Sequence, residues 1–325
     1  MLRLFKQGTL GQVIVIIAAA LLLWWRAFVW PVEVKGVDFF SPLYELLCGW
    51  TMAAPRLASA VALLLILGEG AWLNLMLTNH KMTRINSLMP MLLYLVAMSW
   101  NSELLTLTPL ILVNAMVLLA CSQLLSDGST SLSVDRNFNA SFFIGLMALC
   151  YLPALWYIVP FLFVFVVYKL YRWRDVVVSV FGLIAPSVIL FTYAFLSDRL
   201  DYYLILIWHD IVAMNPHWVT LPFWKMLPTL LFVLLLTAAL MKQLGTLNEG
   251  TVHHRINTGV LTLPLTAWVV MLIYSEWFPL DTQSVAVPFS FLVTFFLMTE
   301  RKREWISEVM IWLLLVCCCI NVLLF

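Results

Sequence analysis

The sequence predicts an all-α integral membrane protein, a polytopic transmembrane helical bundle of about eleven spans. Hydrophobic residues make up 63% of the 325 residues, and charged residues only 11%. Because this small number of charged residues cannot cover a water-facing surface, lipid must be the main solvent of the folded chain. The formal net charge of +1 offers no basic face for phosphates, which excludes a nucleic-acid partner.

The apolar stretch at 137–168 is the clearest feature of the chain. It reads NFNASFFIGLMALCYLPALWYIVPFLFVFVVY and holds no charged side chain in its 32 residues. One helix of that length would far exceed a hydrocarbon core of about 30 Å. Pro153 and Pro160 interrupt helical hydrogen bonding near its middle. We therefore predict a Pro-broken helical hairpin over 137–174, bent between Leu152 and Pro160, which forms either two full spans or a re-entrant hairpin.

The remaining apolar stretches predict the other spans of a single membrane domain, 1–325. They lie at 10–30, 56–77, 87–100, 105–125, 176–196, 225–244, 259–274, 285–298 and 305–325. The first run continues into bulky Trp24, Trp25 and Trp30 without a small-residue cleavage site, which favours a retained span over a signal peptide. The stretches 31–55 and 198–222 are interrupted by polar residues, and we predict outer loops with helices lying flat on the membrane.

The distribution of basic residues predicts the topology. With the N-terminus inside and the C-terminus outside, 13 of the 18 Lys and Arg residues fall on the inner side and 5 on the outer side. If 137–168 were one span, the count would become 7 against 11. The positive-inside rule therefore favours the hairpin.

Three acidic residues are candidate catalytic groups. Glu69 lies within a predicted span, where a carboxylate costs about 2.5–3.5 kcal/mol on insertion scales and usually faces a cavity or a partner. The alternative is a protonated or paired structural glutamate. Asp38, in the first outer loop, is a candidate general base for an acceptor hydroxyl, or simply an exposed loop acid. Glu103, between two spans, is a candidate wall of an outward-facing polar cavity that we expect to be roofed by the first loop and by 198–222.

Five further residues are candidate substrate-binding or phosphate-binding groups: Arg56, Arg199, His209, Asp210 and His217. The two arginines suit a phosphate. The segment WHDIVAMNPHW could offer two imidazoles and a carboxylate to zinc, but its proline breaks the helical register. Aromatic anchoring at the lipid boundary explains that segment more simply, so we predict no metal site. No C-x-x-C, Walker loop or G-x-S-x-G occurs, and no cofactor is indicated.

Several stretches resemble a known group of proteins. They are MLRLFK, NSLMPMLLYLVAMSW, LTPLILVNAMVLLA and FNASFFIGLMALCYLPALWYIVPFLFVFVVYKLYRWRDVVVSVFGLIAPSVILFTYAFLSD. They look like an uncharacterised family of bacterial polytopic inner-membrane proteins, over most of the chain. The resemblance implies the bacterial inner membrane but no activity. Some members carry the label of carotenoid-cleaving oxygenases, which resemble β-propellers with a four-histidine iron site. That label conflicts with an almost wholly helical chain.

The architecture is also similar to that of membrane glycosyltransferases that use polyprenyl-phosphate sugars. Those enzymes place an acidic residue in the first outer loop, next to flat interfacial helices, as Asp38 before 41–50 would be here. This similarity implies a transferase acting on a lipid-linked substrate at the outer face, in cell-envelope biogenesis, with membrane lipid as its surroundings. Two alternatives stay open: a non-enzymatic envelope-assembly or scaffold subunit, and a transporter with Glu69 and the hairpin at midplane.

Overall fold

The protein is an all-helical membrane protein. A computed structural model describes residues 5, 9–31, 40–82, 87–125, 132–168, 172–213, 223–246, 251–274, 280–299 and 304–324. Within these ranges every regular element is a helix and no strand occurs. Six of the described helices or helix pairs are long and apolar enough to cross a membrane: Leu10–Val29, Pro55–Asn79, Trp173–Leu196, Met226–Thr246, Val252–Ile273 and Asp281–Met298.

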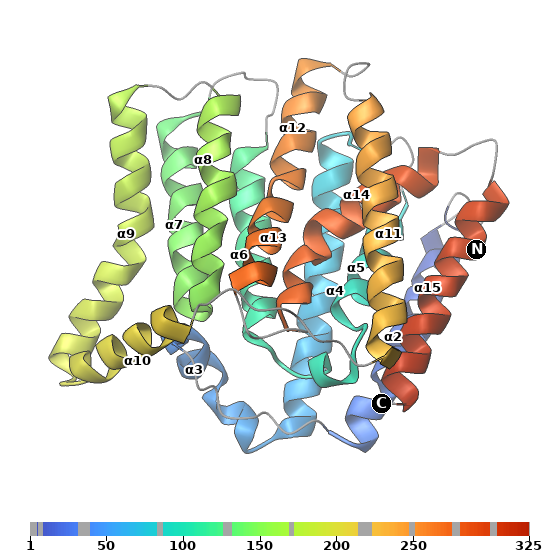
Figure 1. Ribbon diagram of the computed structural model, residues 1–325, viewed down its shortest axis with the longest axis horizontal. Helices are drawn as coiled ribbons and strands as arrows, with labels where there is room; N and C mark the ends of the chain where they lie inside the picture. Colours follow the sequence, from blue (N-terminus) through green and yellow to red (C-terminus); the bar gives the residue numbers. More distant parts are fainter. Residues whose placement is uncertain are drawn as a thin grey trace.

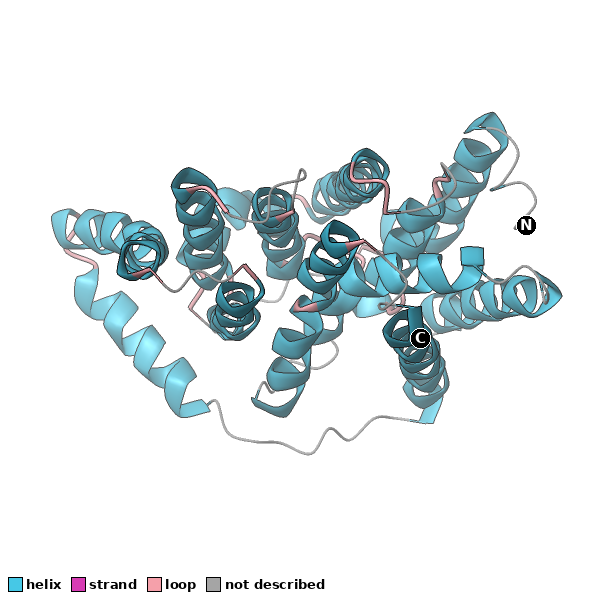
Figure 2. Cartoon of the chain, turned by 90° about the horizontal axis from the view of Figure 1, so that it is seen from above, coloured by secondary structure: helices cyan, strands magenta, loops and turns pink. Residues whose placement is uncertain are grey.

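The helices stand side by side in an elongated bundle (Figure 1), and from above most of them are seen nearly end-on (Figure 2). The main helices are α2 (Thr9–Val29), α4 (Pro55–Asn79), α5 (Met89–Met98), α6 (Pro109–Leu124), α7 (Val134–Cys150), α8 (Ile158–Val167), α9 (Trp173–Leu196), α11 (Phe223–Thr246), α12 (Val252–Thr262), α13 (Pro264–Tyr274), α14 (Ala286–Thr299) and α15 (Glu304–Leu324). Of these, α14 crosses the bundle obliquely in Figure 1. The other elements are α3 (Pro42–Cys48), α10 (Leu200–Ala213) and the 3₁₀ turns η1 (Gly49–Met52), η2 (Ser102–Leu104), η3 (Leu152–Tyr157) and η5 (Leu280–Val285).

Local sequence explains where several helices begin. Pro55 and Pro109 stand at the starts of α4 and α6, where a missing backbone N–H costs nothing and a fixed φ favours the helix. Ser133 and Thr251 cap α7 and α12, because each hydroxyl accepts a hydrogen bond from the backbone N–H three residues later. These starts are therefore readable from the sequence alone.

The proline-containing block changes direction within η3. Pro153 lies in this turn, whereas Pro160 is the third residue of α8, where the first-turn N–H groups have no helical acceptor to lose. The turn therefore ends at Tyr157, before the second proline. Figure 1 shows α7 and α8 running in opposite directions, so that the start of α7 and the end of α8 lie at the same end of the bundle.

One predicted span is two helices. The stretch predicted at 259–274 begins earlier, with α12 at Val252, and is interrupted at Leu263 before α13. The interruption has a local cause: Leu263 keeps helical dihedral angles, but Pro264 has no backbone N–H to continue the helical hydrogen bonds.

Two glycines allow α7 and α9 to pack closely. A methyl group on Gly145 would lie 2.4 Å from the carbonyl oxygen of Leu183, and one on Gly182 would lie 2.7 Å from that of Phe138. Ser179 of α9 also donates to Asn137 Oδ1 of α7 at 3.0 Å. Small residues and interhelical hydrogen bonds are the usual means of helix association in lipid, where the hydrophobic effect between helices is absent.

Gly145→Ala should lower the thermal stability of the detergent-solubilised protein, because the added methyl group collides with the α9 backbone. Overpacking typically costs about 1–3 kcal/mol. Gly68→Ala is the matched control, since a methyl group at Gly68 would meet nothing within 4 Å. Thermal unfolding should place Gly145→Ala below the original protein and Gly68→Ala at or above it. Equal midpoints for the two variants would contradict the close α7–α9 contact.

Candidate functional site

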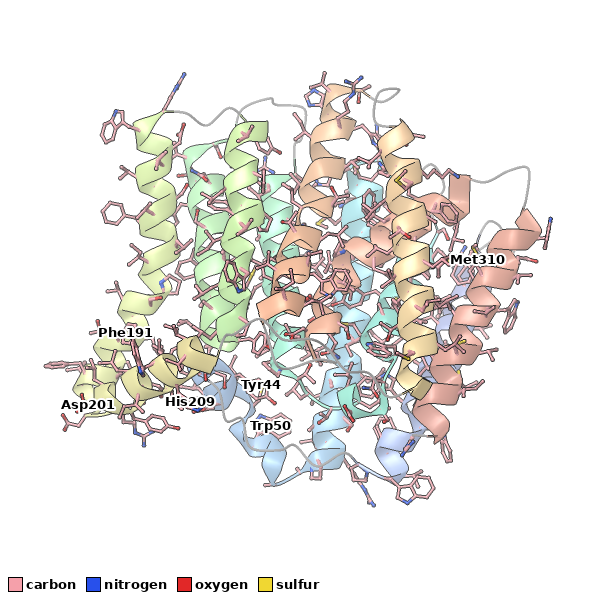
Figure 3. The ribbon with its side chains drawn as sticks, viewed as in Figure 1. Tyr44, Trp50, Phe191, Asp201, His209 and Met310 are labelled. Carbon is pink, nitrogen blue, oxygen red and sulfur yellow. The ribbon has the colours of Figure 1, made fainter. Side chains whose placement is uncertain are left out.

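Two short helices, α3 and α10, lie at the same end of the bundle. Figure 3 shows Tyr44 and Trp50 near α3, and Asp201 and His209 along α10, at this end. Both segments expose large apolar side chains alongside polar ones: Leu46, Leu47, Trp50, Tyr202, Leu204, Ile205, Trp208, Ile211 and Val212 are all exposed. This mixture is typical of helices that lie in the interface between lipid and water.

A buried carboxylate joins the two segments. Asp210 is 7% exposed, and its Oδ2 accepts a hydrogen bond of 2.6 Å from the backbone N–H of Phe40. His209 Nδ1 lies 3.6 Å from Asp210 Oδ1. Burial raises the pKa of Asp210, while the Phe40 N–H and His209 act in the opposite direction. We call this contact between positions 170 residues apart the Asp210 clasp.

Apolar packing supports the clasp from within. Phe40, Leu149, Leu152, Ala194 and Tyr203 form a separate buried cluster. The rings of Phe40 and Tyr203 meet edge to face, with centroids 6.1 Å apart, a favourable arrangement for aromatic pairs. This cluster fixes α10 against the ends of α7 and α9.

Charged groups surround α10 at this end of the bundle. Burial raises the pKa of Glu45 in α3. The pKa of Tyr203 is also raised, first by burial and then by Glu45, while Arg199 lowers it. Glu45 and Arg199 therefore both interact electrostatically with Tyr203 on α10. A carboxylate and a guanidinium thus both act on the buried Tyr203 at this end of the bundle.

The predicted site residues do not form one pocket in the described part of the chain. Arg199 and Asp210 are at opposite ends of α10, about 16 Å apart along its axis. Glu69 is 13 positions beyond Arg56 on α4, about 20 Å further into the bundle. Glu69 and Arg56 are therefore well separated along α4.

The other predicted residues have varied surroundings. Arg56 and Glu103 are exposed, and Glu103 accepts a 3.4 Å hydrogen bond from Asn101. His209 is exposed beside the buried Asp210. Asp38 and His217 lie outside the described residues. Of the eight candidates, His209 and Asp210 are the pair that the structure places side by side.

A buried polar cluster escaped sequence reasoning. Asp281 lies between the predicted spans 259–274 and 285–298, in a stretch expected to be a loop, yet it is 1% exposed, and Gln283 and Ser284 are fully buried. We call residues 281–284 and their hydrogen-bond partners the polar junction.

Gln283 connects the junction to α5 and α6. Thr108 donates to Gln283 Oε1 at 2.7 Å, and Gln283 Nε2 donates to the carbonyl of Met98 at 3.0 Å. Asn114 Nδ2 donates to the backbone carbonyl of Gln283 at 3.0 Å. The oxygen and the nitrogen of the Gln283 side-chain amide are therefore both hydrogen-bonded, which offsets the cost of burying this polar group.

Aromatic donors complete the junction. Tyr151 donates to Asp281 Oδ1 at 2.7 Å, and Trp100 Nε1 donates to the Thr282 hydroxyl at 2.8 Å. Tyr157 donates to the carbonyl of Ser284 at 3.2 Å. The sequence does contain one hint of this junction: the uncharged polar residues 282–284 stand directly before an apolar span. An ordinary solvated loop would have the same composition, so the sequence does not distinguish the two.

Cavities within the bundle have almost wholly apolar walls. One lies between α11, α13 and α14, lined by residues such as Phe232, Trp268 and Phe289. A second lies between α6, α8 and the α12–α13 break, lined by residues such as Cys121 and Phe161. In the described ranges, no three His, Cys, Asp or Glu side chains are grouped so that they could hold a metal ion.

Asp210→Ala should loosen α3 from α10. The loss of a hydrogen bond to a charged group costs about 1.5–3 kcal/mol. Cys48 of α3 reports on this opening, because its thiol is buried and burial raises its pKa to about 11. We expect alkylation of Cys48 by N-ethylmaleimide, followed by peptide mass spectrometry, to accelerate roughly tenfold.

Asp210→Asn keeps an acceptor oxygen, so Cys48 should be alkylated more slowly in this variant than in Asp210→Ala. Asp201→Ala, at an exposed position on the same helix, is the control and should match the original protein. If Asp201→Ala and Asp210→Ala are alkylated equally fast, the clasp does not hold α3 in place.

No family model, curated protein or solved structure matches this chain.

Proposed function

We propose that the protein is a membrane-embedded transferase that acts on a lipid-linked, polyprenyl-phosphate substrate at the face formed by α3 and α10. The observation that carries this proposal is the Asp210 clasp. It joins the segment after α2 to a second interfacial helix through a buried carboxylate with a neighbouring imidazole. A site for a lipid-linked substrate has to lie at this depth, because the lipid chain stays in the bilayer while the phosphate stays at headgroup level.

The chemistry of this face suits both parts of such a substrate. Exposed Trp50 and Trp208 match the lipid boundary, where tryptophan is enriched. Arg199 offers a guanidinium, which pairs with phosphate oxygens in a bidentate manner. Asp210, whose pKa burial raises, and the neighbouring imidazole of His209 offer groups that can transfer protons.

The proposed reaction is a glycosyl-type transfer. The hydroxyl oxygen of an acceptor forms a bond to the transferred carbon, and the bond from that carbon to the polyprenyl-phosphate oxygen breaks. Asp38, two positions before Phe40 in the sequence, is the proposed base that takes the hydroxyl proton. The released phosphate keeps the electron pair and is held by Arg199.

The proposal includes a topology. The face with α3 and α10 is outside a bacterial inner membrane, and the chain makes about eleven passes, beginning inside. The described basic residues support this orientation. Figure 1 shows the starts of α7, α9 and α12 at the opposite end of the bundle, and these starts carry Arg136, Arg174 and Arg255.

Loss of the transferase should cause its lipid-linked substrate to accumulate. We expect cells carrying Asp38→Ala or Arg199→Ala in place of the original gene to accumulate a polyprenyl-phosphate-linked intermediate at least several-fold, because the base or the phosphate ligand is missing. Mass spectrometry of extracted lipids measures this change. Asp135→Asn, at the other end of the bundle, is the control and should leave the lipid profile unchanged.

Protein levels in the membrane fraction must be equal in all strains, so that misfolding does not mimic inactivity. Unchanged lipid profiles in both Asp38→Ala and Arg199→Ala would reject the transferase and leave a scaffold role as the better explanation of this face.

A further inference from the structure

The carboxyl group of Glu69 lies in a part of the bundle with almost no charge. It is 7% exposed. The helices packed against α4 with the most contact are α2, α5 and α6. Between them they carry one charged side chain, Arg26, and its guanidinium donates to the carbonyl of Val322 on α15. The described surroundings of Glu69 therefore supply no cation to balance a carboxylate.

One hydrogen-bond donor reaches this carboxyl group. The hydroxyl of Tyr94 on α5 donates to Glu69 Oε2 at 2.5 Å. The other oxygen, Oε1, is buried and has no hydrogen-bond partner. An ionised carboxylate in an apolar interior needs charge pairing and several donors to offset its lost hydration. A single phenol does not meet that need.

A second acceptor without a donor lies in the same cluster. Tyr94 interacts with Asn114 of α6 as well as with Glu69. The orientation of the Asn114 amide follows from its Nδ2, which donates to the carbonyl of Gln283. Its Oδ1 is buried without a partner. Glu69 Oε1 and Asn114 Oδ1 are thus two buried acceptor oxygens near Tyr94 without a hydrogen-bond donor.

We propose that Glu69 is a reversible proton-binding site inside the membrane, enclosed by Tyr94 and Asn114 and separate from the α3–α10 face. A proton on Oε1 cancels the charge and converts one orphan acceptor into a donor. Divalent cations generally take six or more oxygen ligands, more than this cluster holds. Among the described residues, Tyr94 is the titratable side chain in contact with Glu69, and Tyr157 of η3 in turn acts on Tyr94. This inference does not depend on the transferase proposal.

The test uses a carbodiimide that enters membranes. Protonated carboxyl groups in apolar sites add across a C=N bond of N,N′-dicyclohexylcarbodiimide: the oxygen bonds to its carbon and the proton moves to its nitrogen. The purified full-length chain in detergent micelles is treated between pH 5.5 and 9, and the adduct is located by peptide mass spectrometry. We expect one dominant adduct on Glu69, with labelling that falls about tenfold per pH unit above its midpoint.

Variants and a second reagent make the outcome specific. Glu69→Gln should lose the adduct. Tyr94→Phe should keep it to higher pH, because the phenol donor that favours the carboxylate is gone. A water-soluble carbodiimide should instead label exposed acids such as Asp201 and spare Glu69.

Three results would overturn the proposal: no adduct on Glu69 in the original protein, labelling that does not change with pH, or protection by sodium ions at constant pH. The last would show that the cluster holds a metal cation in place of a proton. All three results are measured on the original protein, so the test stands even if a variant does not fold.

Discussion

The fold depends on one constraint: backbone that leaves the helical path inside a membrane bundle must find its hydrogen-bond partners within the protein. Stretches 99–108, 151–157 and 280–285 leave the regular α-helix, and most of their residues are buried. The polar junction joins all three, through Trp100 and Thr108, through Tyr151 and Tyr157, and through residues 281–284. No helix alone could satisfy these groups, so the three interruptions stabilise one another.

This constraint separates inner helices from outer ones. Almost every side chain of α5 is buried, and α14 beside it is buried along most of its length. By contrast, the buried residues of α9 are Ser179, Gly182, Pro186 and Ala194, all small or compact, while its large side chains face outward. A peripheral helix such as α9 thus packs against its neighbour through small residues and turns its large side chains outward. The inner helices α5 and α14 lie beside the buried polar contacts.

Two buried carboxyl groups illustrate how surroundings decide chemistry. Asp210 lies at the end of the bundle and has a backbone N–H and an imidazole beside it, so it can carry charge and hold two segments together. Glu69 lies deep in α4 with a single phenol donor, so charge there is far less favourable. The α3–α10 face and the interior cluster around Glu69 therefore give a carboxyl group chemically different surroundings.

The sequence by itself determined the positions of the apolar helices, because their length and lack of charge are local properties. It also located the bend between Leu152 and Pro160 and the helical segments that form α3 and α10. Only the tertiary structure decided that Asp281 is buried, that Gln283 meets Thr108 across 175 positions, and that Asp210 meets Phe40. Hydropathy indicates which residues enter the membrane, but it does not indicate which helices become neighbours. Hydrogen bonds between polar residues far apart in the sequence depend on which helices are neighbours.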